Sequence, residues 1–375
     1  MTAPLFFLIA GEASGDVLGA HLMRALKEKL GGNVRFAGVG GPHMQAEGLK
    51  LLFPHTELMH FGVVEVLRHI PRLLRRIDQT AKEVLRVEPD ALITIDSPDF
   101  CFRVAKRVKK AAGKKIPLIH YVAPTVWAWR PGRAKKIAKF LDHLLVLFPF
   151  EPPYFLREGL DCTFVGHPLV EAGADKGDGA AFRAARNIPE NTPLLTVLPG
   201  SRRGEADRLL PIFRETVRML RVQHEDLHLT IPTVPHLKKR IVTEGKTWNA
   251  PVHIVEGEAA KYDAFAASDA ALACSGTVAL ELALAGLPAV ITYKISELTA
   301  RLYRRFIRTP FANLINIMHG KMVVPEFLQE KCEPQKIALA VERLLNDPGA
   351  RQKQVDALAA AAGWMGRGQF TPSER

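Results

Sequence analysis

The sequence predicts an α/β protein with two parallel, doubly wound sheets. Short apolar runs alternate with helical patterns along most of the chain, as in repeated strand-helix units. Runs such as LFFLIA at residues 5–10 are apolar on both faces, which is typical of strands covered by helices on both sides. The alternation pauses at residues 170–180, which are rich in Gly, Ala and Asp, and then restarts. We therefore expect two Rossmann-like domains that face each other across a cleft.

The first domain should occupy residues 1–172. Its expected strands are 5–10, 35–41, 90–96, 116–122, 143–148 and 162–167, with helices at about 16–30 and 102–112. The opening apolar run is too short for a signal peptide and no basic segment precedes it, so we interpret it as the first strand.

The second domain should occupy residues 173–346. Its expected strands are 194–200, 227–233, 252–257, 270–276 and 288–294, with helices at about 206–222 and 278–285. Ligands of such sheets bind beyond the carboxyl ends of the strands, so the loops that follow the strands should hold the functional residues. Residues 347–375 form a separate C-terminal segment.

Composition and charge narrow the classes of partner. The chain has 375 residues, of which 47% are hydrophobic and 24% charged, as in an ordinary folded protein. Its net charge of +12 indicates an anionic partner: nucleic acid, anionic lipid or a phosphorylated small molecule. The four scattered cysteines favour reduced thiols and the cytosol. No zinc-site spacing and no bilayer-length apolar run occurs, so we expect no metal, no cofactor and no spanning helix.

Two loops of the second domain are candidates for a nucleotide's phosphates. In LPGSRRGE, Ser201 and Arg202 lie between a strand and a helix, where free N–H groups and a guanidinium favour an anion. In SGTVALE, residues Ser275, Gly276 and Thr277 form a similar turn. Each loop could instead be a surface turn or a helix cap, but two of them in one domain favour a nucleotide.

A carboxylate follows the second of these loops. Glu281 lies four residues after Thr277, on the same helical face, where it could accept hydrogen bonds from ribose hydroxyls. The sequence contains neither a Walker motif nor G-x-G-x-x-G, which disfavours ordinary ATPases and dehydrogenases.

Carboxylates also follow strands of the first domain. Asp96 ends the run DALITID and could act as a general base or could cap the next helix. Asp99 suits capping better. The acidic loop GEASGD carries Glu12 and Asp16, where a phosphate would be repelled. We therefore expect this loop to meet an uncharged, hydroxylated group such as a sugar, with Glu12 orienting it.

Two basic segments suit an anionic or lipid partner. Trp127 and Arg130 begin the stretch WAWRPGRAKKIAKF, which could contact single-stranded nucleic acid, a phosphosugar or a lipid headgroup, although no RNA-binding fingerprint accompanies it. The stretch FGVVEVLRHIPRLLRR, residues 61–76, has arginines among apolar residues at helical spacing, and Pro71 could break or kink it. Its apolar positions are Val63, Val66, Leu67, Ile70, Leu73 and Leu74. A core helix and a helix on an anionic membrane both fit this pattern.

Ten short motifs resemble those of the lipid-A-disaccharide synthase family, which are glycosyltransferases of the GT-B fold. In chain order they are AGEASGD, GVGGPHMQAEG, FGVVEVL, IDSPDF, HYVAPTVWAWR, FPFE, FVGHPL, LPGSRRGE, SGTVALELALAGLPAV and NLINIMHGK. So many spaced motifs are specific to this family, beyond a shared fold. The resemblance implies a GT-B fold and an inverting transferase, and GT-B chains often return a C-terminal helix to the first domain.

The resemblance also implies substrates and a location. The donor would be UDP-2,3-diacylglucosamine, the acceptor 2,3-diacylglucosamine 1-phosphate (lipid X), and the product a β-1,6-linked disaccharide. The enzyme would lie on the cytoplasmic face of the inner membrane of a Gram-negative bacterium, against anionic lipids and without nucleic acid. Alternatives are another UDP-sugar transferase or epimerase, or a basic nucleic-acid-binding protein. Nothing in the sequence points to an oligomeric state.

By position, Asp96 matches the family's proposed base and Glu12 its acceptor-side loop. The expected donor contacts are Ser201, Arg202, Ser275, Gly276, Thr277, Glu281 and Asn316. The expected acceptor or membrane contacts are Gly15, Trp127, Arg130, Val66, Leu67, Ile70, Leu73 and Leu74. Asn316 usually follows a Pro in this family, whereas Ile315 precedes it here.

Overall fold

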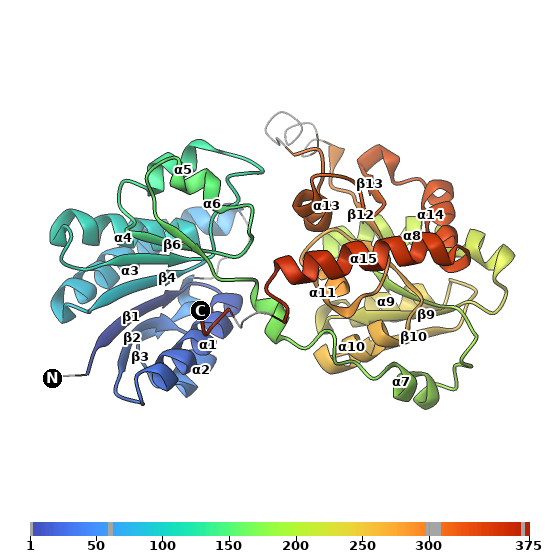
Figure 1. The fold of residues 1–375 in the computed structure, drawn as a ribbon, viewed down its shortest axis with the longest axis horizontal. Coiled ribbons are helices and arrows are strands. Elements are labelled where there is room, and N and C mark those ends of the chain that lie inside the picture. The colour runs from blue at the N-terminus through green and yellow to red at the C-terminus, as the bar shows by residue number, and fades with distance from the viewer. Residues whose placement is uncertain (1–2, 59–62, 298–299, 301–308, 369–371) are drawn as a thin grey trace. The chain divides into compact units, whose positions relative to one another are not determined.

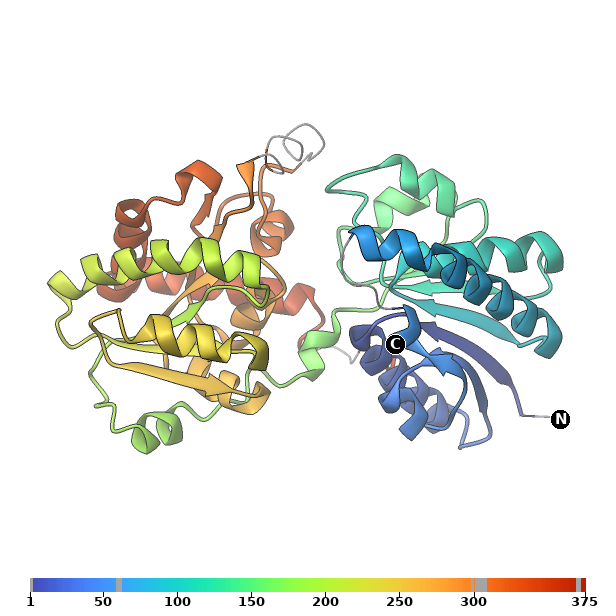
Figure 2. The same cartoon turned by 180° about the vertical axis from the view of Figure 1, so that it is seen from behind.

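The chain folds into two α/β units, each built on one parallel sheet with helices over its faces (Figures 1 and 2). The computed structural model describes residues 3–58, 63–297, 300, 309–368 and 372–375, and only the backbone of residues 63–69. Unit 1 comprises Met1–Pro168 with Phe370–Arg375, and unit 2 comprises Leu169–Gln369. The predicted fold class, two doubly wound parallel sheets, is confirmed.

Unit 1 has a sheet of seven described strands in the order β3-β2-β1-β4-β5-β6-β7, all parallel. The strands are β1 (Leu5–Ala10), β2 (Arg35–Gly40), β3 (Leu49–Pro54), β4 (Ala91–Ile95), β5 (Leu118–Tyr121), β6 (His143–Val146) and β7 (Cys162–Phe164). β1 pairs with β2 on one side and β4 on the other, and its residues Phe7 to Ala10 are fully buried. This central position explains why the run is apolar on both faces.

The helices of unit 1 are α1 (Ala13–Lys29), α2 (Pro42–Ala46), α3 (Val63–Val87), α4 (Pro98–Ala112), α5 (Gly132–Ile137) and α6 (Pro152–Leu156). A short 3₁₀ turn lies at His55–Leu58, and a second one, Pro168–Glu171, crosses the boundary to unit 2. α3 continues through Pro71, so the proline does not end the helix. Ile77, Ala81 and Val84 on α3 reach the main core of the unit, which explains how the helix persists beyond the proline.

Unit 2 has a sheet of six described strands in the order β10-β9-β8-β11-β12-β13, again all parallel. The strands are β8 (Leu194–Leu198), β9 (His228–Thr233), β10 (Val252–Glu256), β11 (Ala270–Cys274), β12 (Ala289–Tyr293) and β13 (Glu326–Leu328). The helices are α7 (Gly179–Ala185), α8 (Arg203–Gln223), α9 (Lys238–Gly245), α10 (Glu258–Ala267), α11 (Val278–Ala285), α13 (Leu314–His319), α14 (Pro334–Asn346) and α15 (Pro348–Trp364), with 3₁₀ turns at Pro235–Leu237 and Gln329–Lys331.

The C-terminal segment divides between the two units. α15 packs on α11, α13 and α14 in unit 2, where the Gln354 side chain accepts a hydrogen bond from the Ala289 N–H (Figure 1). Beyond it, the Arg375 guanidinium lies 5.7 Å from the ring centre of Phe164 in unit 1. Residues 347–375 are therefore not one structural segment.

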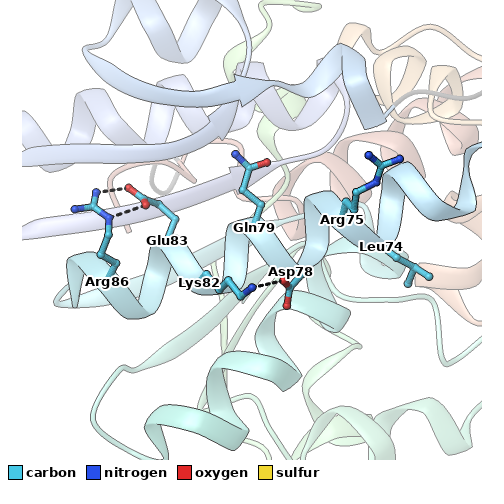
Figure 3. Close-up of a pocket in the computed structure, with 7 residues that line it drawn as sticks. All are labelled: Leu74, Arg75, Asp78, Gln79, Lys82, Glu83 and Arg86. Atoms are coloured by element: carbon cyan, nitrogen blue, oxygen red, sulfur yellow. Dashed lines mark hydrogen bonds and ion pairs between the residues drawn. The ribbon is translucent and has the colours of Figure 1, made fainter.

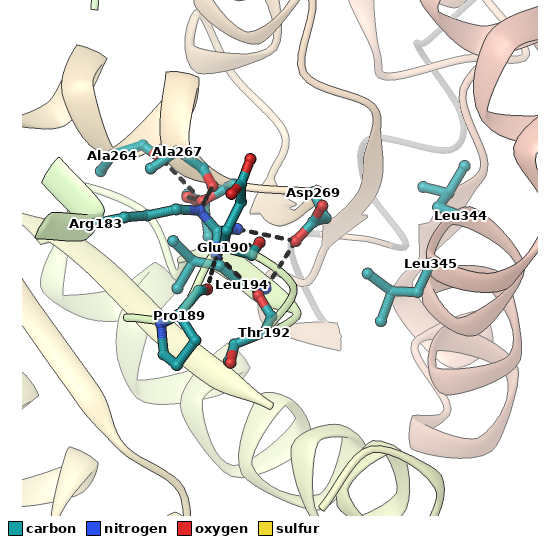
Figure 4. A network of polar contacts seen from close by, with 12 residues as sticks. Arg183, Pro189, Glu190, Thr192, Leu194, Ala264, Ala267, Asp269, Leu344 and Leu345 are labelled. Atoms are coloured by element: carbon teal, nitrogen blue, oxygen red, sulfur yellow. Dashed lines mark hydrogen bonds and ion pairs between the residues drawn. The ribbon is translucent and has the colours of Figure 1, made fainter. Parts of the chain in front are cut away.

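One arginine organises the start of unit 2 (Figure 4). The Arg183 side chain on α7 donates hydrogen bonds to the carbonyl oxygens of Ala267 and Thr192, both at 2.9 Å. Its Nη2 lies 3.2 Å from Asp269 Oδ2, and that same oxygen accepts a bond from the Leu194 N–H at 2.9 Å. A planar guanidinium thus ties α7 to the starts of β8 and β11, a geometry that a lysine cannot reproduce.

We expect Arg183→Lys to lower the free energy of unfolding by roughly 1.5–3 kcal/mol, since the positive charge stays but most of these bonds are lost. Urea unfolding followed by circular dichroism measures this. The matched control is Arg218→Lys, which alters an exposed pair with Glu215 on α8. If both substitutions lower the free energy of unfolding by equally small amounts, the Arg183 hydrogen bonds do not stabilise unit 2 as expected.

Candidate functional site

Asp96, the predicted base, lies directly after β4 at the carboxyl edge of the unit 1 sheet. Its side chain is half-buried, and its N–H donates to the Tyr121 carbonyl at 3.0 Å. Asp96 and Ser97 have positive φ angles of 50° and 42°, and Val122, after the neighbouring β5, has a φ of 78°. Such conformations cost on the order of 1–3 kcal/mol each and cluster at functional sites. Three of them on adjacent strand ends mark this edge as a candidate site.

Glu12 comes from the loop after β1 and reaches the same edge. The Ser97 hydroxyl lies 3.5 Å from Glu12 Oε1, and the Glu12 side chain is exposed. A Cβ on Gly11 would stand only 2.5 Å from Ser97 Oγ, so the absence of a side chain at Gly11 lets the two loops meet. The structure therefore brings the loops of Glu12 and Asp96 together.

Asp16 and Gly15, from the same acidic motif, lie in α1 and make contacts inside unit 1. The buried Asp16 carboxylate accepts bonds from the backbone N–H groups of Gly41, His43 and Met44 at 2.7–3.1 Å, so it holds the start of α2 and does not face a ligand. Gly15 is buried in α1, where a Cβ would lie 3.3 Å from Ala10 Cβ. Packing of α1 on β1 therefore accounts for this glycine, and the expected acceptor contact at Gly15 stays a prediction.

Asp99, the other candidate base, lies in the first turn of α4. Ser97 occupies the N-cap position, so Asp99 is not the capping residue that the sequence predicted. Its side chain is 91% exposed and lies 3.4 Å from Arg133 Nη2.

Trp127 is anchored by a buried carboxylate. Its indole N–H donates to Glu151 Oε1 at 3.2 Å, while Glu151 Oε2 accepts the N–H groups of Leu147 and Phe148 at 3.0 Å. Burial raises the pKa of Glu151 to about 7, against the opposing effect of these N–H donors. The polar edge of Trp127 is therefore used inside unit 1. Arg130 is exposed, and its guanidinium lies 4.1 Å from the Trp129 ring centre.

The helix with the mixed apolar and basic pattern, α3, has two different apolar faces. Leu73 is partly buried and packs against the core of unit 1, so it has a structural role whether or not the expected membrane contact exists. Ile70 and Leu74 are exposed, at 39% and 40%. The side chains of Val66 and Leu67 lie outside the described residues. The core and the surface interpretations of this segment thus each hold for part of it.

Some of the arginines on α3 form ion pairs with a carboxylate of the same unit. Arg72 and Arg76 both bind Glu57, and these hydrogen bonds lower the pKa of its carboxyl group. Figure 3 shows the outer face beyond them, where Leu74 and Arg75 precede the ion pairs Asp78–Lys82 and Glu83–Arg86. Among the described side chains of α3, the combination of apolar and positively charged groups therefore occurs at the N-terminal end, before the two ion pairs.

Unit 2 contains a cavity of about 600 Å³ at the carboxyl edge of its sheet. Its lining includes Pro199 to Arg202 after β8, Thr233 to Pro235 after β9, Gly257, Glu258 and Lys261 after β10, Cys274 to Val278 after β11, and Glu205 and Glu281 on helices. Both predicted phosphate loops thus border one cavity, together with Glu281.

In the first loop, Arg202 is 81% exposed and pairs with Glu205 Oε1 at 3.0 Å. Gly200 has a φ of 104°, and a Cβ there would lie 2.7 Å from the Glu205 carboxylate, so glycine is required for this close approach. Ser201 is exposed, and its carbonyl oxygen lies 3.0 Å from His236 Nε2. The loop is therefore folded on itself, with Arg202 at its surface.

In the second loop, Ser275 is occupied internally. Its N–H donates to the Thr292 carbonyl at 2.7 Å and its hydroxyl to the Ala312 carbonyl at 3.1 Å. Gly276 and Thr277 are exposed at the start of α11, where backbone N–H groups have no helical acceptor. The anion-binding capacity of this loop therefore rests on residues 276–278.

Asn316 is fully buried on α13, against the expected direct donor contact. Its side-chain oxygen accepts the N–H groups of Val323 and Val324, both at 2.9 Å, and its amide donates to the Val324 carbonyl at 2.9 Å. Nearby, Glu326 accepts the Asn313 N–H at 2.7 Å. Glu326 also accepts the Ala312 N–H at 3.1 Å and lies 3.5 Å from the Asn316 amide nitrogen, so Asn316 is linked through Glu326 to the loop that the Ser275 hydroxyl contacts.

Glu281 has a partner that the sequence analysis missed. Lys261 Nζ on α10 lies 2.9 Å from Glu281 Oε2 at the cavity wall. Lys261 belongs to no motif named above, and the contact arises from the packing of α10 beside α11. Lys261 is recognised only in the structure, from its place in the cavity lining and its contact with Glu281.

Comparison with known proteins identifies the family. The sequence profile of the lipid-A-disaccharide synthetase family matches residues 6–363. A lipid-A-disaccharide synthase of Rhodospirillum centenum is 57% identical over 371 residues, which cover 99% of this chain and 92% of the relative. The chain belongs to the lipid-A-disaccharide synthase family. The expectation drawn from the ten motifs is confirmed.

Solved structures agree on the fold of this family member. The S. aureus MnaA structure with UDP has a TM-score of 0.61 at 14% identity and covers 94% of this chain and 91% of its own. MurG of Acinetobacter baumannii has a TM-score of 0.60 at 12% identity, with coverages of 96% and 95%. At such identities the likeness concerns the fold alone, which is GT-B.

Three kinds of feature are absent from the described residues. No cluster of three His, Cys, Asp or Glu side chains suited to a metal ion occurs there. No helix in the described part of the chain is long and apolar enough to cross a bilayer. The four cysteines, all described, form no disulfide.

The raised pKa of Glu151 predicts a pH-dependent stability. Because the folded protein binds this proton more tightly than the unfolded chain, the contribution of Glu151 is present near pH 4.5 and is lost as the pH rises through about 7. The stability of the wild type relative to Glu151→Gln should fall by on the order of 3 kcal/mol over this range. Urea unfolding at several pH values measures it. A difference that instead grows with pH would mean that the three N–H donors outweigh burial.

Proposed function

We propose that this chain transfers 2,3-diacylglucosamine from UDP-2,3-diacylglucosamine to the 6-hydroxyl of lipid X, with inversion at the anomeric carbon. The products are UDP and a β-1,6-linked disaccharide 1-phosphate. The observation that carries this proposal is the family match over residues 6–363, since members of this family are UDP-sugar glycosyltransferases. The reaction belongs to lipid A biosynthesis.

We assign the donor to the cavity of unit 2. Arg202 and the N–H groups at the start of α11 would bind the diphosphate, and Glu281 the ribose. Ser201 and Ser275 hold the two loops in place. Support comes from the location of these groups around one cavity and from the UDP in the MnaA structure of the same fold.

We assign the acceptor to the carboxyl edge of unit 1, with Asp96 as general base. A primary alcohol attacks the anomeric carbon effectively only when its proton is removed, which a carboxylate within hydrogen-bond reach achieves. Asp96 is half-buried on a strained turn, whereas Asp99 is exposed and adjacent to Arg133. Glu12, in contact with Ser97, would accept hydrogen bonds from other sugar hydroxyls.

We also propose that unit 1 contacts anionic lipid on the cytoplasmic face of the inner membrane. Ile70 and Leu74 expose apolar surface beside Arg75 on α3. Residues 101–141, which run from the second turn of α4 to beyond α5, contain many Lys and Arg but no Asp or Glu. An apolar face with adjacent positive charge suits the surface of an anionic bilayer, from which both lipid substrates must come.

A second candidate is another reaction of a UDP-sugar, such as epimerisation. The fold alone permits it, because UDP-GlcNAc 2-epimerases share this architecture, including that of Neisseria meningitidis with a TM-score of 0.59. Product analysis with UDP-diacylglucosamine and lipid X separates the two. Formation of disaccharide supports the transferase, while a changed UDP-sugar without transfer supports the epimerase.

Asp96→Asn should reduce disaccharide formation by roughly 10²- to 10⁴-fold, because the amide keeps the shape but cannot accept the proton. Asn also tolerates a positive φ, so the turn should persist. UDP affinity should stay unchanged, since the donor cavity lies in unit 2. Asp99→Asn is the matched control and should stay active. If Asp99→Asn loses activity while Asp96→Asn keeps it, the base is Asp99.

The double variant Ile70→Ser and Leu74→Ser should lower co-sedimentation with vesicles containing phosphatidylglycerol roughly tenfold, because two exposed apolar contacts are removed. The thermal melt should be unchanged, as both side chains are exposed. The control pair Val222→Ser and Leu339→Ser removes exposed apolar groups from unit 2. Unchanged vesicle binding would exclude this part of α3 from the membrane contact.

A further inference from the structure

Lys261 and Glu281 form an ion pair inside the wall of the donor cavity. Lys261 comes from α10 and Glu281 from the first turn of α11. Their Nζ and Oε2 atoms are 2.9 Å apart, and the two side chains are only 22% and 13% exposed. A pair shielded to this extent is held more firmly than one on the open surface, since solvent competes less for both charges.

The surroundings of Lys261 direct it to Glu281 and not to the other nearby carboxylate. Glu258, also in the cavity lining, accepts a hydrogen bond from the Tyr262 hydroxyl at 2.8 Å. Burial raises the pKa of Tyr262, so this hydroxyl keeps its proton and remains a donor. The Lys261 ammonium lies 4.7 Å from the Tyr262 ring centre, a second contact that restrains it. The two carboxylates therefore have separate partners.

We propose that Lys261 is a positioning residue for Glu281 and thereby sets the preference of the donor cavity for a ribonucleotide. The ammonium holds Glu281 Oε2 in place and leaves Oε1 to accept hydrogen bonds from ribose hydroxyls. This inference rests on the proposed function, in which the cavity binds the UDP part of the donor. It adds a residue that touches Glu281 and not the sugar.

The physical consequence is a selectivity against deoxy analogues. A fixed carboxylate binds a hydroxyl without first losing rotamer freedom, which strengthens binding of the hydroxylated ligand. A ligand without the hydroxyls leaves Oε1 of the shielded carboxylate without a partner, and such sites reject it strongly. Release of Glu281 from Lys261 should therefore weaken ribonucleotide binding and leave the binding of a deoxy analogue nearly unchanged.

The test is calorimetric titration of the full chain with UDP and with 2′,3′-dideoxy-UDP. The wild type should prefer UDP by roughly tenfold or more. Lys261→Met should reduce this preference several-fold by weakening UDP alone, and Lys261→Arg should restore most of it. In the Lys261→Met background, Glu281→Gln should have little further effect on the preference. Lys238→Met is the matched control, because it breaks a Lys–Glu pair of 2.6 Å in the same unit outside the cavity lining.

Three outcomes would overturn the inference. An equal loss for both ligands would mean that Lys261 binds the phosphates or the base. An unchanged preference in Lys261→Met would make the ion pair a purely structural contact. A wild type that binds both ligands equally would remove Glu281 from the ribose site. By contrast, a wild type that binds neither ligand would refute the proposed donor cavity itself, which distinguishes the two failures.

Discussion

Buried and half-buried carboxylates that accept backbone N–H groups hold the segments on which the site depends. Asp16 binds the start of α2, Glu151 binds the turn after β6, Asp269 binds the start of β8, and Glu326 binds the segment before α13. Each gives backbone N–H groups at the end of an element a fixed side-chain acceptor, which such groups need once they are removed from water. The strained turn at Asp96 and Ser97 has a separate restraint, because the Asp96 N–H donates to the Tyr121 carbonyl of the neighbouring strand.

This arrangement separates two kinds of acidic residue that look alike in the sequence. Asp16 and Glu12 belong to one short motif at the start of α1, yet Asp16 is buried and bonded to α2 whereas Glu12 remains exposed. The same distinction applies to Glu151 and Asp99. The sequence shows where a charged residue lies but not which N–H groups contact it in the fold. The partners of Asp16, about 25 residues away in sequence, could therefore not be predicted. The central strands could be predicted, because a strand with neighbours on both sides must be apolar on both faces. Edge strands lack that requirement: β3 and β13 were missed, although the edge strands β7 and β10 were predicted.

The site was predictable to a similar extent. The two predicted phosphate loops and Glu281 line one cavity, and motifs identify them because a turn between a strand and a helix needs glycine and small polar residues. The internal contacts of Leu73 and Asn316 could not be predicted, since the direction in which each side chain leaves its helix depends on tertiary packing. Lys261 was not predicted for the same reason. A single lysine belongs to no motif, and its role depends on the carboxylate that it contacts on the adjacent helix.

The contact between Gly11 and Ser97 links two positions that are far apart in the chain. A methyl group at position 11 would collide with the Ser97 side chain, and a smaller residue at position 97 would remove the hydroxyl that faces Glu12. Neither position can change alone without disturbing the turn that carries Asp96. Over evolutionary time the two residues should therefore be inherited as a single unit, and homologues that differ at one should differ at the other.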